Sequence, residues 1–433
     1  MTTTGGAWQA AARLVRRTGF GATGREVDAV LAAGSASYVR SVLAAAPDPA
    51  PAPPPVAPLP RAPKDASADQ RRAANRQIEG QQAQVTTWWL QRMVTTTTPF
   101  AEKLTFCWHD HFATSAQKVR SATWLLQQNQ KLRTLGRGDF RTLAMAMLTD
   151  AAMLRWLDGV ASTGTSPNEN LAREFMELFA LGHGDGYTEA DVRAGAKALT
   201  GWVARPDGTT YLVPRRHDDT PQTFLGVHGV DDAASYCDAV LTRPQSPRYL
   251  ATRWWGQLAS GDPPSPALLE ALTAAYGPGY DLTAMFTTML TRPEFAVAEG
   301  TLVVGPVEWL VGVLRALQVP VGDAQVARRT VGALRALGQE PFYPPSVGGW
   351  PGGQAWLSTA AADLRVRLAA AVAARADLSA ITASARGNRL DAVAYLLGIA
   401  SWSSRSAAAL TPEVGSPARL VALAVNTPEY LVH

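Results

Sequence analysis

Apolar residues recur three or four positions apart along most of this chain, and that spacing predicts one helix after another. Thr23 and Glu26 have the spacing of a capping box, which predicts a short helix ending near Gly34, and Thr188 and Asp191 resemble a second capping box. Pro99 suits the first turn of a later helix, and a single long helix is predicted over 115–135, with Gly136 as its stop. Helical patterns also cover 35–46, 139–148, 150–157, 168–182, 188–201, 266–276, 282–291, 306–317, 324–337 and 356–375.

Two stretches break this pattern. Nine of the seventeen residues from 47 to 63 are proline, which predicts an extended connector that cannot contribute to a packed core. It acts either as a spacer or as a flexible insertion in a surface loop. Over 203–229 the helical period disappears, and two short strand-like runs predict one hairpin or a long irregular loop.

Together these patterns predict an all-α fold, a large multi-helix domain with a short irregular or hairpin segment around 203–229. The predicted organisation is an N-terminal helical arm over 1–46, the proline-rich connector over 47–63 and the main helical domain over 64–433.

Composition narrows the class of protein. Hydrophobic residues make up 47% of the chain and charged residues 18%, which is typical of a globular protein. The net charge is +4, but the basic residues are scattered, so we expect no nucleic-acid partner. Two cysteines cannot form a disulfide framework, and the amino terminus lacks an apolar leader core. We therefore expect a cytoplasmic protein without a membrane span, whose oligomeric state the sequence leaves open.

The segment from 168 to 182 sets charged residues into an otherwise apolar helix. On a helical wheel Asn170, Arg173, Glu174 and Glu177 fall within roughly 100° of one another. Three interpretations fit this arc: a solvated face with an Arg173–Glu177 pair, a buried network that fixes the packing, or a set of metal ligands.

Two of the six histidines, His109 and His111, lie one residue apart in Trp-His-Asp-His-Phe. If the helix ends there and the backbone becomes extended, both side chains point the same way, as two metal ligands require. An aromatic corner between Trp108 and Phe112, with hydrogen-bonded histidines, is the alternative. His217 and Asp218 lie in the irregular segment, where they either complete a site or form a solvated turn.

Motifs for other chemistries are missing from the sequence. It contains no Walker loop, no Gly-x-Ser-x-Gly elbow and no His-Glu-x-x-His helix, so we expect no nucleotide cofactor.

Several longer motifs resemble those of one bacterial family, catalogued as domain of unknown function 1800. They are 102–115 (EKLTFCWHDHFATS), 168–179 (NENLAREFMELF), 187–192 (YTEADV), 198–202 (ALTGW), 217–218 with 223–226 (HD and TFLG), and 344–353 (PPSVGGWPGG). The resemblance runs from about Arg13 to the C-terminus and leaves out the proline-rich connector. It implies a helical domain whose polar motifs occur together, and it assigns no activity. The positions it carries over are His109, His111, Asn168, Glu169, Arg173, Glu174, Glu177, His217 and Asp218; Cys107 departs from the larger apolar residue expected there.

Two functional hypotheses follow. In the first the protein is a metal-dependent enzyme, oxygen-activating or hydrolytic, acting on an unknown small molecule or peptide. Its iron, manganese or zinc ion would be held by His109, His111, Glu174 and Glu177. The residues expected to act in catalysis are Arg173, Glu169, His217 and Asp218. The second hypothesis is a non-catalytic helical scaffold or binding protein whose buried polar network is structural. The loop over 341–353, with Trp350, is either a lid or a buried structural turn.

Overall fold

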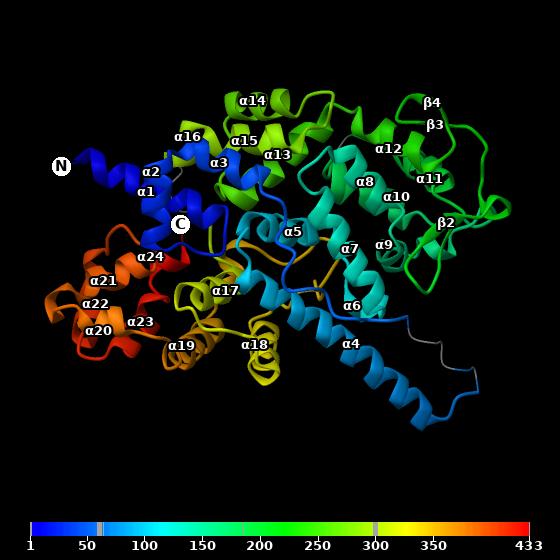
Figure 1. The fold of residues 1–433 in the computed structure, drawn as a ribbon. Coiled ribbons are helices and arrows are strands. Elements are labelled where there is room, and N and C mark those ends of the chain that lie inside the picture. Colours follow the sequence, from blue (N-terminus) through cyan, green and yellow to red (C-terminus); the bar gives the residue numbers. More distant parts are fainter. Residues whose placement is uncertain (1, 59–62, 64, 185, 298–301, 433) are drawn as a thin grey trace.

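The computed structural model describes residues 2–58, 63, 65–184, 186–297 and 302–432 (Figure 1). The chain is mostly helical, at 63%, with two small two-stranded sheets, which confirms the predicted fold class.

The elements follow one another in this order. The first are α1 (Thr2–Arg17), α2 (Gly24–Ala33), α3 (Ser35–Ala44), α4 (Ala68–Thr95), α5 (Pro99–His111), α6 (Ala116–Val119), α7 (Ala122–Leu135), α8 (Phe140–Leu148), α9 (Ala151–Trp156), α10 (Asn170–Glu174), a π-helix (Phe175–Ala180) and α11 (Glu189–Ala198). Next come β1 (Trp202–Ala204), β2 (Thr210–Leu212), β3 (Gln222–Phe224) and β4 (Val227–Val230). They are followed by α12 (Ala233–Leu241), α13 (Gln245–Leu258), α14 (Pro266–Tyr276), α15 (Leu282–Thr291), α16 (Pro293–Val297), α17 (Pro306–Ala316) and α18 (Ala324–Ala336). The last are α19 (Thr359–Ala373), α20 (Ser379–Ala383), α21 (Arg389–Leu396), α22 (Ser404–Leu410), α23 (Pro417–Ala424) and α24 (Pro428–Leu431).

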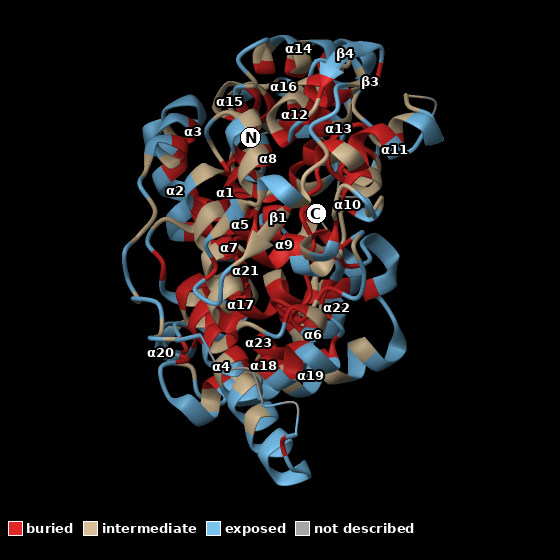
Figure 2. Ribbon diagram, turned by 90° about the vertical axis from the view of Figure 1, so that its right-hand side faces the viewer, coloured by how far each residue is buried: buried red, intermediate tan, exposed pale blue. Residues whose placement is uncertain are grey.

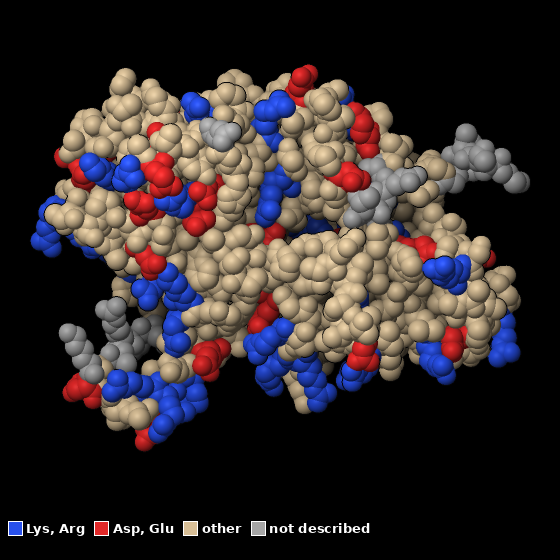
Figure 3. All heavy atoms as spheres, turned by 180° about the vertical axis from the view of Figure 1, so that it is seen from behind, with Lys and Arg blue, Asp and Glu red and all other residues tan. Residues whose placement is uncertain are grey.

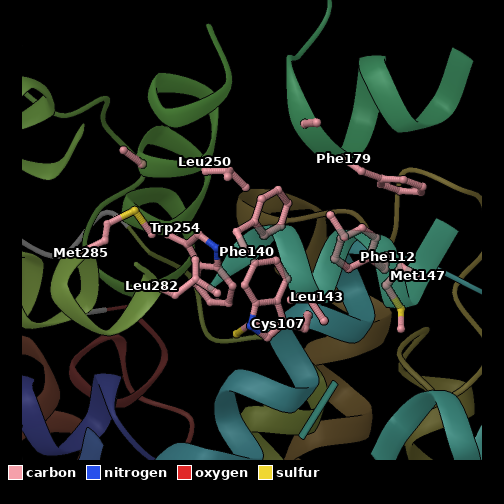
Figure 4. Close-up of a cluster of buried hydrophobic side chains, with 14 of the residues drawn as sticks. Cys107, Phe112, Phe140, Leu143, Met147, Phe179, Leu250, Trp254, Leu282 and Met285 are labelled. Atoms are coloured by element: carbon pink, nitrogen blue, oxygen red, sulfur yellow. The ribbon is translucent and has the colours of Figure 1, made fainter. Parts of the chain in front are cut away.

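The helices pack around two apolar clusters, and α5 lies between them. The first cluster draws on α1–α3 and α8–α16, the second on α4 and α17–α24. Helix α5 gives Leu104 and Trp108 to the first cluster and Phe106 to the second. Figure 4 shows the first cluster beside α5, where the rings of Phe112, Phe140 and Trp254 gather. Because α5 is covered on both sides, its polar side chains are enclosed by protein.

A buried ion-pair network joins α4, α5 and α7. Glu102 of α5 is fully buried, and its two carboxylate oxygens accept hydrogen bonds from Arg133 at 2.6 and 2.9 Å. Arg92 of α4 donates to Glu102 Oε1 at 2.5 Å, and the Trp89 indole N–H lies 3.2 Å from Oε2. Burial alone would raise the pKa of Glu102, but Arg133 and Arg92 together lower it, so the carboxylate is ionised. A buried network was one of the three interpretations of the 168–182 segment; the structure has such a network here, at Glu102.

Local signals for helix ends are confirmed where the cap is made by neighbouring residues. The Thr23–Glu26 capping box opens α2 and Gly34 ends it, and Thr188 with Asp191 opens α11 in the same way. The single helix predicted over 115–135 is wrong. It is divided at Arg120, which takes a left-handed conformation at φ 56°, and Ser121 caps a new helix. Gly136 does end α7 as predicted.

The irregular segment contains two hairpins, where one hairpin or a loop was predicted. Strand β1 pairs antiparallel with β2, and β3 pairs antiparallel with β4. Gly208 and Gly226, at φ 88° and 78°, lie in the two turns, where a residue with a side chain would be strained.

The proline-rich connector is held against α4 over its described part. The Trp88 indole donates to the carbonyl of Pro51 at 2.9 Å, and the Asp48 carboxylate accepts from the main chain of Thr97 at 3.1 Å. Val56 packs against the second apolar cluster. The expectation that this stretch adds nothing to a core is therefore wrong for Val56, while residues 59–62 lie outside the described part.

Helices α1–α3 belong to the first apolar cluster, to which they contribute Leu14, Val27 and Val39. The predicted division into an arm over 1–46, a connector and a main domain stays a prediction. The exposed N-terminal half of α4 projects from the molecule (Figure 2).

Two surface expectations concern partners. Within the described residues, every helix is too short or too polar to cross a membrane. On the face drawn in Figure 3, basic and acidic side chains are interspersed. That face is in keeping with the expectation of no nucleic-acid partner, which stays a prediction.

Candidate functional site

The two imidazoles of the Trp-His-Asp-His-Phe motif point to different sides of α5. The helix continues through His111, so residues two apart are turned roughly 200° from each other rather than sharing a face. His109 faces the second cluster, between the rings of Trp89 and Trp350. His111 faces the first cluster and contacts Phe112. The expectation of an extended backbone that aligns the two imidazoles is therefore wrong.

Both imidazoles bond to main-chain groups. The N–H of Phe342 donates to His109 Nε2 at 3.1 Å, and His111 Nε2 donates to the carbonyl of Phe179 at 2.9 Å. Burial lowers the pKa of each imidazole to about 3, so both are neutral. This arrangement matches the aromatic corner with hydrogen-bonded histidines, which was the alternative to a pair of ligands.

The glutamates of the 168–182 segment surround Arg173 on a partly exposed face. Arg173 donates to Glu189 at 2.6 and 2.8 Å and to Glu169 at 3.0 Å, and it lies 3.9 Å from Glu177. Glu177 also lies 3.5 Å from His183 Nδ1. Burial and the neighbouring Glu177 raise the pKa of Glu174. Arg173 therefore holds carboxylates of its own chain, as in the solvated-face interpretation.

A π-helix, rather than a regular helix, carries the second half of this segment. The N–H of Leu181 reaches the carbonyl of Met176, five residues back. His111 and Tyr249 donate to the last carbonyls of this turn, those of Phe179 and Leu178. Figure 4 shows the Phe179 ring turned toward Phe112. What connects the histidine motif to this segment is thus a main-chain carbonyl and a ring, not the glutamates.

The four expected metal ligands consequently do not converge. Among the residues that the structure describes, no group of three or more His, Cys, Asp and Glu side chains is placed to hold a metal ion. This corrects the expectation of one ligand set made from His109, His111, Glu174 and Glu177. Its physical reason is the continuous helix α5, which separates the two imidazoles.

His217 and Asp218 lie against the end of α11. His217 Nδ1 is 3.0 Å from the carbonyl of Thr200, whose hydroxyl accepts from the N–H of Asp218 at 2.8 Å. Nearby, Ser162 bonds to the main chain of Asn168 and of Gly201. These motif residues connect the hairpin segment to α10 and α11. They lie apart from His109 and His111.

A polar pocket lies on the third side of α5, beside Asp110. It has a volume of about 200 Å³ and is bounded by the end of α1, by α5, α13 and the start of α17, and by the loop over 350–356. Asp110 Oδ1 accepts from the main chain of Trp350 at 2.8 Å, and Oδ2 accepts from Gln257 at 3.1 Å. Five charged side chains line the pocket: Arg17, Lys103, Asp110, Arg253 and Glu308.

The charges in this pocket are only partly paired. Lys103 lies 2.6 Å from Glu308, and Arg253 lies 3.5 Å from Asp110. Burial raises the pKa of Asp110, an effect that Arg253 opposes. Arg17 is 3% exposed, and its Nε and Nη2 have no hydrogen-bond partner in the described part of the chain. Buried polar groups are normally satisfied, so a partly open pocket with free donors is the strongest candidate for a binding site.

Sequence reasoning singled out none of these five residues as a site. Asp110 lies between the two histidines to which the metal hypothesis gives ligand roles, and no sequence motif assigns a role to Arg17. A usable signal was present, because Glu308 is a lone charge within an apolar helical stretch, and Glu102 and Lys103 are adjacent charges within another. Their convergence depends on how α1, α5, α13 and α17 pack, which no local pattern specifies.

The loop over 341–353 is built onto the pocket through Gly349. This residue has φ 85°, and a Cβ added there would overlap the Asp110 carboxylate and lie 2.6 Å from the Asp110 carbonyl oxygen. We expect Gly349→Ala to lower the free energy of unfolding by about 2–4 kcal/mol through backbone strain and overlap. Urea denaturation measures this change.

The matched control is Gly348→Ala, one residue earlier. A Cβ there would meet Ser346 Oγ at 3.6 Å, an ordinary contact, so we expect a change below about 1 kcal/mol. Equal effects of the two substitutions would contradict close packing of Gly349 on Asp110.

Comparison with known proteins identifies the family of this chain and assigns it no activity. No curated protein and no solved structure matches the chain. The model of the family described as "Protein of unknown function (DUF1800)" matches residues 13–432, nearly the whole chain. The protein therefore belongs to the DUF1800 family.

Proposed function

We propose that this protein is an enzyme that binds a small polar molecule in the pocket beside Asp110 and acts on it by acid–base catalysis. The observation that carries the proposal is the convergence of five charged side chains from four helices on one partly open pocket. Burying charge is costly unless it is paired, and free donors such as those of Arg17 are found where a ligand supplies the partner.

Asp110 is the residue suited to move a proton. Its carboxyl is held at both oxygens, by the main chain of Trp350 and by Gln257, so its position is fixed. Burial raises its pKa above the ordinary value for aspartate, which makes its carboxylate a stronger proton acceptor. Arg253, 3.5 Å away, stabilises the ionised form after the proton has left.

No step of this proposal passes through a metal ion. The nitrogens of His109 and His111 that bond to main-chain groups lie on different sides of α5. The iron, manganese or zinc site of the sequence-based hypothesis would need another set of ligands. The scaffold hypothesis is supported by one observation, that both histidines and Glu102 stabilise packing. It leaves the polar pocket without a role.

The test compares the purified protein with Asp110→Asn in the small-molecule fraction of a cell extract. We expect the unsubstituted protein to consume at least one compound, as followed by mass spectrometry, and Asp110→Asn to do so at least roughly 100-fold more slowly. Asn keeps the shape of the side chain and cannot exchange the proton at neutral pH.

A suitable control is Asp238→Asn, which changes a carboxylate paired with Arg141 outside the pocket. It should leave consumption unchanged. If no compound is consumed by the unsubstituted protein, or if Asp110→Asn is as fast, the enzymatic proposal fails.

A further inference from the structure

We infer that the ligand of the Asp110 pocket is a small monocarboxylic acid whose carboxylate is bound by Arg17. The inference rests on the proposed function, because it names the class of molecule that enters the same pocket. It is carried by the unpartnered edge of Arg17, the charge of the lining and the size of the cavity.

The free edge of Arg17 has the geometry that a carboxylate needs. Arg17 ends α1, and its Nε and Nη2 are the two atoms left without a partner in the described part of the chain. The two N–H groups on that edge are parallel, and one carboxylate accepts both of them side by side. A lone hydroxyl or carbonyl oxygen could accept both N–H groups only through two bent, and therefore weaker, hydrogen bonds.

The net charge of the side chains that line the pocket favours a ligand with one negative charge. The lining holds three basic and two acidic side chains. Lys103 is paired with Glu308 and Arg253 with Asp110, and Glu308 also attracts Arg17, so one positive charge remains in excess. A monoanion neutralises that excess, whereas a phosphate dianion would bring a second negative charge close to two buried carboxylates.

The remaining lining limits the rest of the molecule. A cavity of about 200 Å³ is smaller than the ~300–1,000 Å³ of pockets for drug-sized ligands, so the acid has few carbon atoms. Trp350 lines the cavity, and its indole N–H has no acceptor among the described residues. That donor would be satisfied by a hydroxyl or carbonyl oxygen, which favours a hydroxy or oxo acid.

The experiment uses the full-length protein with lactate, pyruvate, propionate, their uncharged amides and inorganic phosphate. Isothermal titration calorimetry measures binding of each compound at neutral pH. We expect the acids to bind at least tenfold more tightly than the matched amides and than phosphate, with lactate or pyruvate ahead of propionate.

Arg17→Gln should remove the preference for acid over amide. Its control is Arg13→Gln, which makes the same change of charge on the same helix at a half-buried arginine that donates to the carbonyl of Ala259. Arg13→Gln should keep the preference. Should Arg17→Gln fail to fold, the comparison of acids with amides on the unsubstituted protein still decides the question.

The outcomes separate this inference from the proposed function. Amides or phosphate that bind as tightly as the acids would overturn the carboxylate inference and leave the pocket as a binding site. An unchanged acid preference in folded Arg17→Gln would overturn the role of Arg17. If none of the probes binds, the carboxylate inference is wrong, and the extract experiment with Asp110→Asn decides the proposed function on its own.

Discussion

Replacing Glu102 with alanine is expected to lower the free energy of unfolding by about 3–5 kcal/mol. The substitution leaves the guanidinium groups of Arg92 and Arg133 buried without the carboxylate that now binds both. Both arginine side chains are at most 4% exposed, so water cannot replace the lost partner without opening the contact between α4, α5 and α7. The shift of the urea denaturation midpoint at neutral pH measures the loss.

Glu189→Ala is the matched control, because Glu189 also accepts two hydrogen bonds from one arginine, Arg173. That side chain is 64% exposed and solvent screens the pair, so we expect little or no loss. A loss at Glu102 no larger than the loss at Glu189 would show that burial of the network does not matter, and would remove the main support for its structural role.

The features of the fold that could be predicted from the sequence are those set by contacts between residues close in the chain, such as the start of a capped helix. The capping boxes at Thr23 and Thr188 are local, and both helices begin where they indicate. The break at Arg120 is not local: the N–H of Ala116 donates to the carbonyl of Phe342, more than two hundred residues away, and this contact fixes the short helix α6. The prediction of one hairpin is wrong for another reason. Asp207-Gly208, between β1 and β2, is a turn signal of the kind that joins paired strands, so this turn was readable from the sequence.

In the candidate site, too, local sequence features could be predicted and features that depend on long-range packing could not. The sequence-based hypothesis gave the metal-binding roles to histidine and glutamate, the residue types that usually bind metals in helical proteins. In the structure His109 and Asp110, consecutive residues of α5, hold two ends of one loop, at Phe342 and Trp350. Which of the two faces a cavity depends on the rotation of α5 between two apolar clusters, and this is settled by packing across the whole chain.

Because of that packing, the imidazoles of His109 and His111 are buried and stay neutral in the folded protein. The pKa of His109 and of His111 is lowered to about 3 by burial, from an ordinary value near 6.5. Between these values the unfolded chain binds more protons than the folded protein, so stability is complete above about pH 6.5 and falls as the pH drops toward 3. We expect each imidazole to contribute a few kcal/mol to this loss, measured as urea denaturation midpoints from pH 7 to pH 4.

How steeply the free energy of unfolding falls with pH, rather than its value at one pH, shows whether the imidazoles cause the loss of stability in acid. His111→Gln will lower stability at pH 7, because the bond to the Phe179 carbonyl is altered, but its stability should fall less steeply on acidification. His228→Gln changes an exposed histidine and should keep the steepness of the unsubstituted protein. Carboxylates titrate in the same range in all three proteins, so their contribution cancels in the comparison. A slope for His111→Gln equal to the others would mean that the folded protein accepts a proton at His111 as readily as the unfolded chain does, and that the contact between α5 and the π-helix does not require a neutral imidazole.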